Sequence, residues 1–229
     1  MPEKNGRRAK RGDSGRSRPL VMAVVPLALV AAAAVGVRWN SAHGDSSPSA
    51  AFTVARAAAT GNGPGNAYRV EVEDGSGVDP DTAAAKIAGI LAAPRGWAHR
   101  GEHTFRQVAE GPAGLVIRIA TPETTDRICG RSGLDTHGEV NCRVGEVVMV
   151  NLKRWQTGSP EFDGPLAEYR ALIINHEVGH WLGHGHETCP GKGRPAPAMM
   201  QQIDGLKGCV ANAWPYDTKG KYLGGPPVP

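Results

Sequence analysis

Four of the eight histidines of this 229-residue chain fall within the stretch HEVGHWLGHGH, residues 176–186. Histidines at positions i and i+4 lie on one face of an α-helix, so His176 and His180 can share one metal ion. A catalytic zinc ion takes three protein ligands and keeps one position open. Because one helix cannot surround the ion, the third ligand must come from beyond it, and Gly183 offers a left-handed turn that brings His186 back. This spacing predicts a zinc site made of His176, His180 and His186.

Glu177 follows the first predicted ligand, and its carboxylate can reach a water on the metal without binding the metal. Zinc lowers the pKa of such a water toward neutrality, so a carboxylate can take its proton as the water attacks a carbonyl carbon. The carboxylate can then pass the proton to the leaving amine. We therefore predict zinc-dependent hydrolysis of peptide bonds with Glu177 as general base. The alternative is a non-catalytic binding module, whose zinc site would close its fourth position and need no base.

The full pattern His-Glu-x-x-His-x-x-Gly-x-x-His is far more demanding than its first five positions, which occur by chance in helices. A histidine-rich helix end exposed to solvent would not require the glycine at position 183. His184 also follows His180 by four residues. On a continuing helix it would lie a further turn along, too far from a metal bound by His176, so we expect His184 beside the site or in solvent.

These residues resemble the extended motif of the metzincin zinc peptidases, which place a methionine beneath the metal in a turn downstream of the motif. The stretch AMMQQ, residues 198–202, looks like that turn, and the resemblance implies Met200 as the methionine, with Met199 less suitable. The alternative is that both methionines are core residues. The turn lacks the Tyr or Pro that several metzincin families place after the methionine, which leaves Tyr216 as a weak candidate for stabilising the oxyanion.

A second resemblance covers the stretch from Tyr68 to Tyr216. It is similar to an uncharacterised family of exported, membrane-anchored actinobacterial proteins with a metzincin-like domain, through HEVGHWLGHGHETCPGKGRPAPAMMQQ and GLKGC...NAWPY. This implies a zinc peptidase that acts on a peptide or protein, with a cell-wall crosslink as the alternative substrate. Glu187 follows the third histidine as in the astacin-like branch, where such a glutamate anchors a processed N-terminus. No matching N-terminus is evident, so we interpret Glu187 as a surface or turn carboxylate.

The helix that carries the first two histidines is predicted over Pro165–Leu182, with two apolar faces that bury it on most sides. Upstream, Tyr68–Glu73 alternates as a strand, and a helix opens at Asp79–Thr82. Four further strands are predicted at Thr104–Ala109, Gly114–Ala120, Val140–Arg143 and Glu146–Leu152. This order predicts an α+β fold. With the resemblance, it implies a metzincin-like zincin domain over 67–217, with a mixed sheet and a Met-turn, and a frayed C-terminal tail over 218–229.

The net charge of +4 does not indicate a nucleic-acid binder, because residues 1–18 alone carry seven basic and two acidic side chains. Their net charge of +5 leaves −1 for the rest of the chain. The uncharged run Leu20–Val37 is just long enough to cross a bilayer, and the basic residues before it place the N-terminus in the cytoplasm. We predict a cytoplasmic tail over 1–18, a single transmembrane helix over 19–37 and a flexible linker over 38–66. A cleaved signal peptide is the alternative, and both export the domain.

The four cysteines are an even number in the part predicted to be exported, where oxidising conditions favour disulfides. A cysteine zinc site is disfavoured because the chain has no C-x-x-C pair. Of the three possible pairings we predict Cys129–Cys142, which would brace the loop before a strand pair, and Cys189–Cys209, which would enclose the candidate Met-turn. No free thiolate would then remain to block the zinc.

Overall fold

The computed structural model describes residues 50–57 and 64–228. The predicted cytoplasmic tail, 1–18, and transmembrane helix, 19–37, lie outside these residues, as does most of the predicted linker. Within the described part of the chain, no helix is long and apolar enough to cross a membrane.

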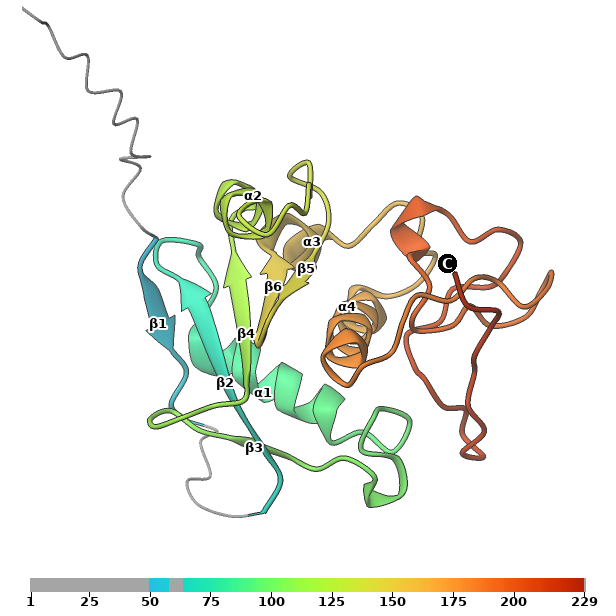
Figure 1. The fold of residues 1–229 in the computed structure, drawn as a ribbon, viewed down its shortest axis with the longest axis horizontal. Helices are drawn as coiled ribbons and strands as arrows, with labels where there is room; N and C mark the ends of the chain where they lie inside the picture. Colours follow the sequence, from blue (N-terminus) through green and yellow to red (C-terminus); the bar gives the residue numbers. More distant parts are fainter. Residues whose placement is uncertain (1–49, 58–63, 229) are drawn as a thin grey trace, which may run out of the picture. The chain divides into compact units, whose positions relative to one another are not determined.

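The described residues form one mixed sheet of six strands (Figure 1). The strands are β1 (Phe52–Val54), β2 (Asn66–Glu73), β3 (Phe105–Gln107), β4 (Leu115–Ala120), β5 (Cys142–Val144) and β6 (Val147–Asn151). At its centre β2, β4 and β6 run parallel, while β1 and β5 lie antiparallel to their neighbours at the two ends. β3 pairs with the start of β2 and not with β4. The five predicted strands are confirmed, with ends shifted by a few residues.

Two helices cover one face of the sheet and form the main core with it (Figure 1). α1 (Pro80–Leu91) starts where predicted, because the Asp79 side chain accepts from the amide of Thr82 at 2.7 Å. α4 (Leu166–Trp181) also matches its prediction to within a residue at each end. The sheet supplies alternate apolar side chains that point to these helices. They are Val70, Val72, Ile117, Ile119, Val148 and Val150, all buried.

The opposite face of the sheet packs against a helix that the sequence did not predict, α2 (Pro122–Gly130). Its sequence PETTDRICG has little apolar periodicity, and its start depends on the Thr121 side chain, which accepts from the amide of Thr124. α2 carries Cys129, and the predicted disulfide to Cys142 is confirmed. The short helix α3 (Leu152–Thr157) was also missed. The predicted order of one strand, one helix, four strands and a long helix is therefore wrong at two points.

The folded region extends beyond the predicted range 67–217 on both sides. β1 pairs with β2, so the prediction of a flexible linker over 38–66 is wrong for Phe52–Val54. The prediction of a frayed tail is wrong for Tyr222–Val228, which hydrogen-bonds to the rest of the fold. Beyond α4 the chain has little regular structure (Figure 1), and the predicted disulfide Cys189–Cys209 closes part of it. The short helices η1 (His99–Gly101) and η2 (Gln202–Asp204) complete the described elements.

Candidate metal centre and catalytic cleft

Helix α4 is a fixed platform for the first two histidines, because nine of its 16 residues are buried. Gly183, just past its end, adopts the predicted left-handed conformation, with φ of +95°. The amide of His184 then donates to the carbonyl of Gly179 at 2.9 Å and closes the helix end. The chain leaves the helix in a turn that carries His186 back beside it.

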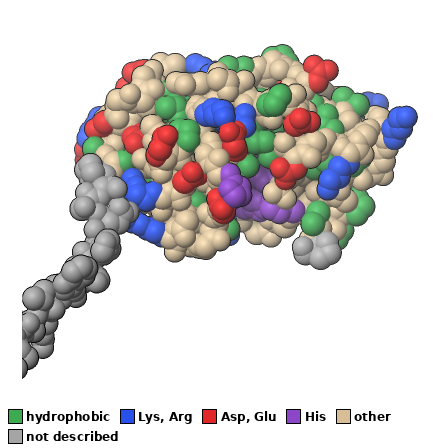
Figure 2. Space-filling model, turned by 90° about the horizontal axis from the view of Figure 1, so that it is seen from above, with side chains coloured by type: hydrophobic (Ala, Val, Ile, Leu, Met, Phe, Trp, Pro, Cys, Tyr) green, Lys and Arg blue, Asp and Glu red, His purple; other side chains and the backbone are tan. Residues whose placement is uncertain are grey.

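The three predicted ligands meet at one point. Nε2 of His180 lies 3.2 Å from Nε2 of His176 and 3.0 Å from Nε2 of His186. One nitrogen from each ring lies within 4.8 Å of the other two, and all three side chains are half-buried. Figure 2 shows histidine side chains gathered in one surface patch, with acidic side chains beside it. The structure therefore brings together the three residues that the motif singled out, in a place that solvent can reach.

Backbone carbonyls determine which ring nitrogen faces this point. Nδ1 of His176 lies 2.9 Å from the carbonyl oxygen of Ala198, and Nδ1 of His180 lies 2.9 Å from that of His184. A carbonyl only accepts, so each Nδ1 carries the proton and each Nε2 presents a bare lone pair. Two lone pairs 3.2 Å apart repel each other unless a cation binds both. The residues therefore fit a metal ion, and such carbonyl bonds are the kind that orient metal-binding histidines.

Burial keeps these imidazoles in the neutral form. Burial, with a smaller contribution from His180, lowers the pKa of His176 to about 3. Burial also lowers the pKa values of His180 and His186 below their usual range. Because zinc binds the neutral imidazole, no proton has to leave these rings at neutral pH before a metal can bind.

Glu177 lies in the same cavity as the three histidines and is almost fully buried. Among the described residues, no side chain or amide forms a hydrogen bond or ion pair with its carboxylate. Burial raises the pKa of Glu177 to about 8, and the opposing charge of Arg143 reduces this rise. A buried carboxyl group with no other partner among the described residues is free to take up a proton and give it back.

A cavity of about 350 Å³ opens beside the three histidines. The first wall of the cavity is α4, and the second is the segment 134–143, which includes the start of β5. The third wall is the segment 200–203, which overlaps the predicted Met-turn. Apolar side chains from all three walls line it, among them Leu134, Leu172 and Ile203. The cavity can therefore accept an apolar side chain next to the three histidines.

Arg143 is the one cation other than histidine among the residues that line this cavity. It is exposed, and its charge acts on Glu177 and on His180. The sequence analysis did not single it out. Strand alternation could have found it: Cys142 points to the α2 side through its disulfide, so the next residue of β5 must face α4.

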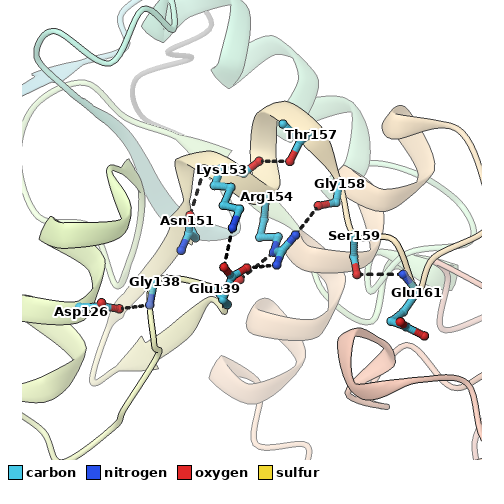
Figure 3. Close-up of polar contacts among 10 residues, drawn as sticks. All are labelled: Asp126, Gly138, Glu139, Asn151, Lys153, Arg154, Thr157, Gly158, Ser159 and Glu161. Atoms are coloured by element: carbon cyan, nitrogen blue, oxygen red, sulfur yellow. Dashed lines mark hydrogen bonds and ion pairs between the residues drawn. The ribbon is translucent and has the colours of Figure 1, made fainter.

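Ion pairs to α3 hold the 134–143 wall in place (Figure 3). The carboxylate of Glu139 accepts from Lys153 and from Arg154, and the Arg154 guanidinium also donates to the carbonyl of Glu139 at 2.8 Å. The Lys153 hydrogen bond and the Arg154 charge hold the pKa of Glu139 below its usual range. On the other side, Asp126 of α2 accepts from a backbone amide of the same wall at 2.8 Å. The wall is thus a braced surface and not a free loop.

The two methionines of the predicted Met-turn occupy different places. Met200 is buried and lines the cavity with the three histidines. Met199 belongs to the main core, where its sulfur fills the space that a side chain on Gly179 would need. The assignment of Met200 to the Met-turn stays a prediction, and its place in the cavity supports it.

Two other residues named from the sequence lie outside the cluster of three histidines. The ring of His184 stacks on Trp97 with 4.3 Å between centroids, while its carbonyl orients His180. The hydroxyl of Tyr216 lies 3.4 Å from the carboxylate of Glu102. Tyr216 is not among the residues that line the cavity, so it is poorly placed to stabilise an oxyanion there.

Comparison with known proteins identifies a family. A family model described as "Protein of unknown function (DUF3152)" matches residues 43–208, which include the sheet, α4 and the three histidines. No curated protein and no solved structure matches the chain. An activity must therefore be inferred from the site itself.

Proposed function

We propose that this chain, which belongs to the DUF3152 family of proteins of unknown function, is a metzincin-type zinc metallopeptidase that hydrolyses peptide bonds outside the cytoplasmic membrane. One observation carries the proposal. Three histidines converge through their Nε2 atoms at the mouth of a cavity that also holds a buried, unengaged glutamate. Three neutral imidazoles with room for a fourth ligand are the donor set of a catalytic zinc site.

The chemistry of each side chain gives its proposed role in the reaction. His176, His180 and His186 would hold the ion, which supplies a Lewis acid for the scissile carbonyl and a water acidified toward neutral pH. Glu177 would accept one proton from the attacking water as the new C–O bond forms. The same carboxyl group would donate that proton to the amine nitrogen as the C–N bond breaks, so that it ends the cycle unchanged. The Glu177 carboxylate lines the same cavity as the histidines and has no other partner among the described residues, so it is free to accept and return the proton.

The cleft supports a peptide as substrate. β5 is the last strand of the sheet, and among the described residues it pairs only with β6, which leaves its other edge free beside α4. An extended peptide can add to such an edge through its backbone. A side chain of that peptide could then enter the apolar cavity between Leu134 and Leu172. These features would place a peptide bond near the histidines and Glu177.

The competing function is a binding module that contains zinc without turnover. A structural zinc site closes its coordination with a fourth protein ligand. Within the described residues, only three candidate ligands meet at this point, and Glu177 lines the same cavity without being one of them. This arrangement favours catalysis over a structural role.

Export of the domain is part of the proposal. All four cysteines form disulfides, which persist in oxidising compartments outside the cytoplasm. The basic residues 1–18 before the uncharged run Leu20–Val37 give the direction of insertion, with the N-terminus inside. The chain would then act as a membrane-anchored enzyme, or as a secreted one if the N-terminal segment is cleaved.

Metal analysis combined with digestion of an unbiased peptide library tests the function. The purified chain should contain one zinc per molecule and cleave a subset of the peptides, and a chelator should abolish cleavage until zinc is returned. A zinc-loaded protein that cleaves no peptide in such a library would favour the binding module. A protein without zinc would refute the metal centre.

A further inference from the structure

Residues 222–228 return to the loop that carries the third histidine, after the chain has passed through the irregular region beyond α4 (Figure 1). The amide of Val228 donates to the carbonyl of His186 at 2.9 Å, and the amide of Thr188 donates to the carbonyl of Pro226 at 2.8 Å. Pro227 lies opposite Glu187 in an antiparallel bridge. The backbone on both sides of Glu187 is thus paired with residues about 40 positions later in the chain.

The same short stretch is also held from its other side. The amide of Glu187 donates to the carbonyl of Met199 at 3.1 Å, and the neighbouring carbonyl, that of Ala198, receives the Nδ1–H of His176. Residues 186–188 therefore lie between the predicted Met-turn and the segment 222–228. His186 follows the turn at Gly183 and has no helix of its own, so these bonds on either side are what determine its position.

The side chain of Glu187 links residues 186–188 to the segment 222–228 by two hydrogen bonds. One carboxylate oxygen accepts from the hydroxyl of Tyr222 at 3.0 Å, and the other accepts from the amide of Gly225 at 3.0 Å. Burial, followed by the charge of Glu187, raises the pKa of Tyr222, so its hydroxyl remains a donor. Only glycine fits at position 225, because a Cβ there would run into the carbonyl of Thr188. Hydrogen bonds to a charged acceptor are about twice as strong as those between neutral groups.

We propose that Glu187 is a positioning residue, and that residues 222–228 form a strap through which it holds His186 in place for the metal. This inference rests on the proposed zinc site. The strap does not touch the ion; it determines the backbone position of the one ligand that no helix carries. Partners of this kind, one step removed from the metal, typically affect metal affinity about 10–100-fold.

Zinc affinity of the full chain tests the strap, measured by competition with a chelator for the wild type, Glu187→Ala and Tyr222→Phe. Tyr216→Phe is the matched control, because Tyr216 packs against Tyr222 and also directs its hydroxyl to a glutamate, but has no bond to the ligand loop. We expect Glu187→Ala to raise the dissociation constant about 10–100-fold. Tyr222→Phe should raise it less, and Tyr216→Phe should leave it unchanged. The visible spectrum of the cobalt-loaded protein should change in the same order.

Melting curves of the metal-free variants separate positioning from plain stability. If Glu187→Ala and Tyr222→Phe lower the melting temperature but bind zinc as tightly as the wild type, the strap is only structural and the inference is wrong. Should Glu187→Ala fail to fold, Tyr222→Phe against Tyr216→Phe decides by itself. A wild-type chain that binds no zinc would overturn the proposed function and this inference together, whereas tight binding in every variant would overturn this inference alone.

Discussion

The chain on the two sides of α4 is built in different ways. Before α4, the parallel strands β2, β4 and β6 bury alternate Val and Ile side chains under α1 and α4. After α4, residues 182–228 form only a short 3₁₀ helix and isolated bridges, and their small core consists of Ala196, Met200 and Cys209. A disulfide and hydrogen bonds to backbone carbonyls hold this second region.

The candidate metal centre lies where these two regions meet. His176 and His180 stand on the helix that the first region buries, whereas His186 belongs to the second region. Apolar burial gives the helix its rigidity without regard to zinc. The second region gains its order from a disulfide and from specific hydrogen bonds, some of which hold the loop of His186. We therefore expect changes in the first region to affect folding, and changes in the second to affect metal binding.

Removal of ligands should give the largest effect. His176→Ala, His180→Ala or His186→Ala should each abolish stoichiometric zinc, because two imidazoles do not form a tight catalytic site. His184→Ala is the control: its ring stacks on Trp97, and its contribution to the site is a backbone carbonyl that alanine retains. Metal content of the purified variants checks this.

The histidine series can also contradict the ligand assignment. If His184→Ala alone lost the metal while His186→Ala retained it, the third ligand would be His184. The turn at Gly183 would then not serve to bring His186 to the ion.

Loss of either disulfide should cost a similar amount of stability, but the two losses should have different effects on zinc binding and on peptide binding. Each closes a short loop, with sequence separations of 13 and 20, so replacement of either pair by serine should cost about 2–4 kcal/mol of stability. Loss of Cys189–Cys209 should also weaken zinc binding, because it loosens the region that holds His186. Loss of Cys129–Cys142 should leave zinc affinity unchanged and raise KM for peptides, because Cys142 lines the cavity. Equal effects of both pairs on zinc affinity would contradict the division into two regions.

A smaller effect, on the stability of the fold, should depend on pH and come from a glutamate in the sheet. Burial alone would raise the pKa of Glu71, but hydrogen bonds and charges from Arg118 and Arg69 outweigh it, so the pKa lies below its ordinary value of 4.5. The folded state thus binds the proton less readily than the unfolded state. This carboxylate stabilises the fold above pH 4.5, and its contribution is lost as the pH falls through the lowered pKa.

Glu71→Gln should therefore cost about 1–3 kcal/mol at pH 7, and the gap to the wild type should narrow as the pH falls below 4.5. Thermal unfolding at several pH values measures this gap, and zinc affinity at pH 7 should be the same for both proteins. If the difference in stability between the two proteins does not change with pH, the ion pairs of Glu71 with Arg69 and Arg118 do not stabilise its charged form.

The contrast between the regions also explains what could be predicted from the sequence. Period-two and helical patterns predicted five strands, α1 and α4, because apolar burial determines those elements. α2 was missed because its start depends on a Thr121 cap and its attachment on a disulfide. The histidine spacing predicted which side chains would meet. The strap could not be predicted, since bonds such as Val228 to His186 depend on backbone placement and leave no periodic trace.

Glu177→Gln tests the central claim most directly, with zinc content and turnover of a cleaved peptide measured on the same preparation. Glutamine is nearly the same size and is not a predicted ligand, so the zinc content should match that of the wild type. An amide cannot accept the proton of the attacking water or return it to the amine, so kcat should fall by about 10²–10⁴. A variant that keeps both its zinc and its turnover would contradict the account, because the base would have to be another group.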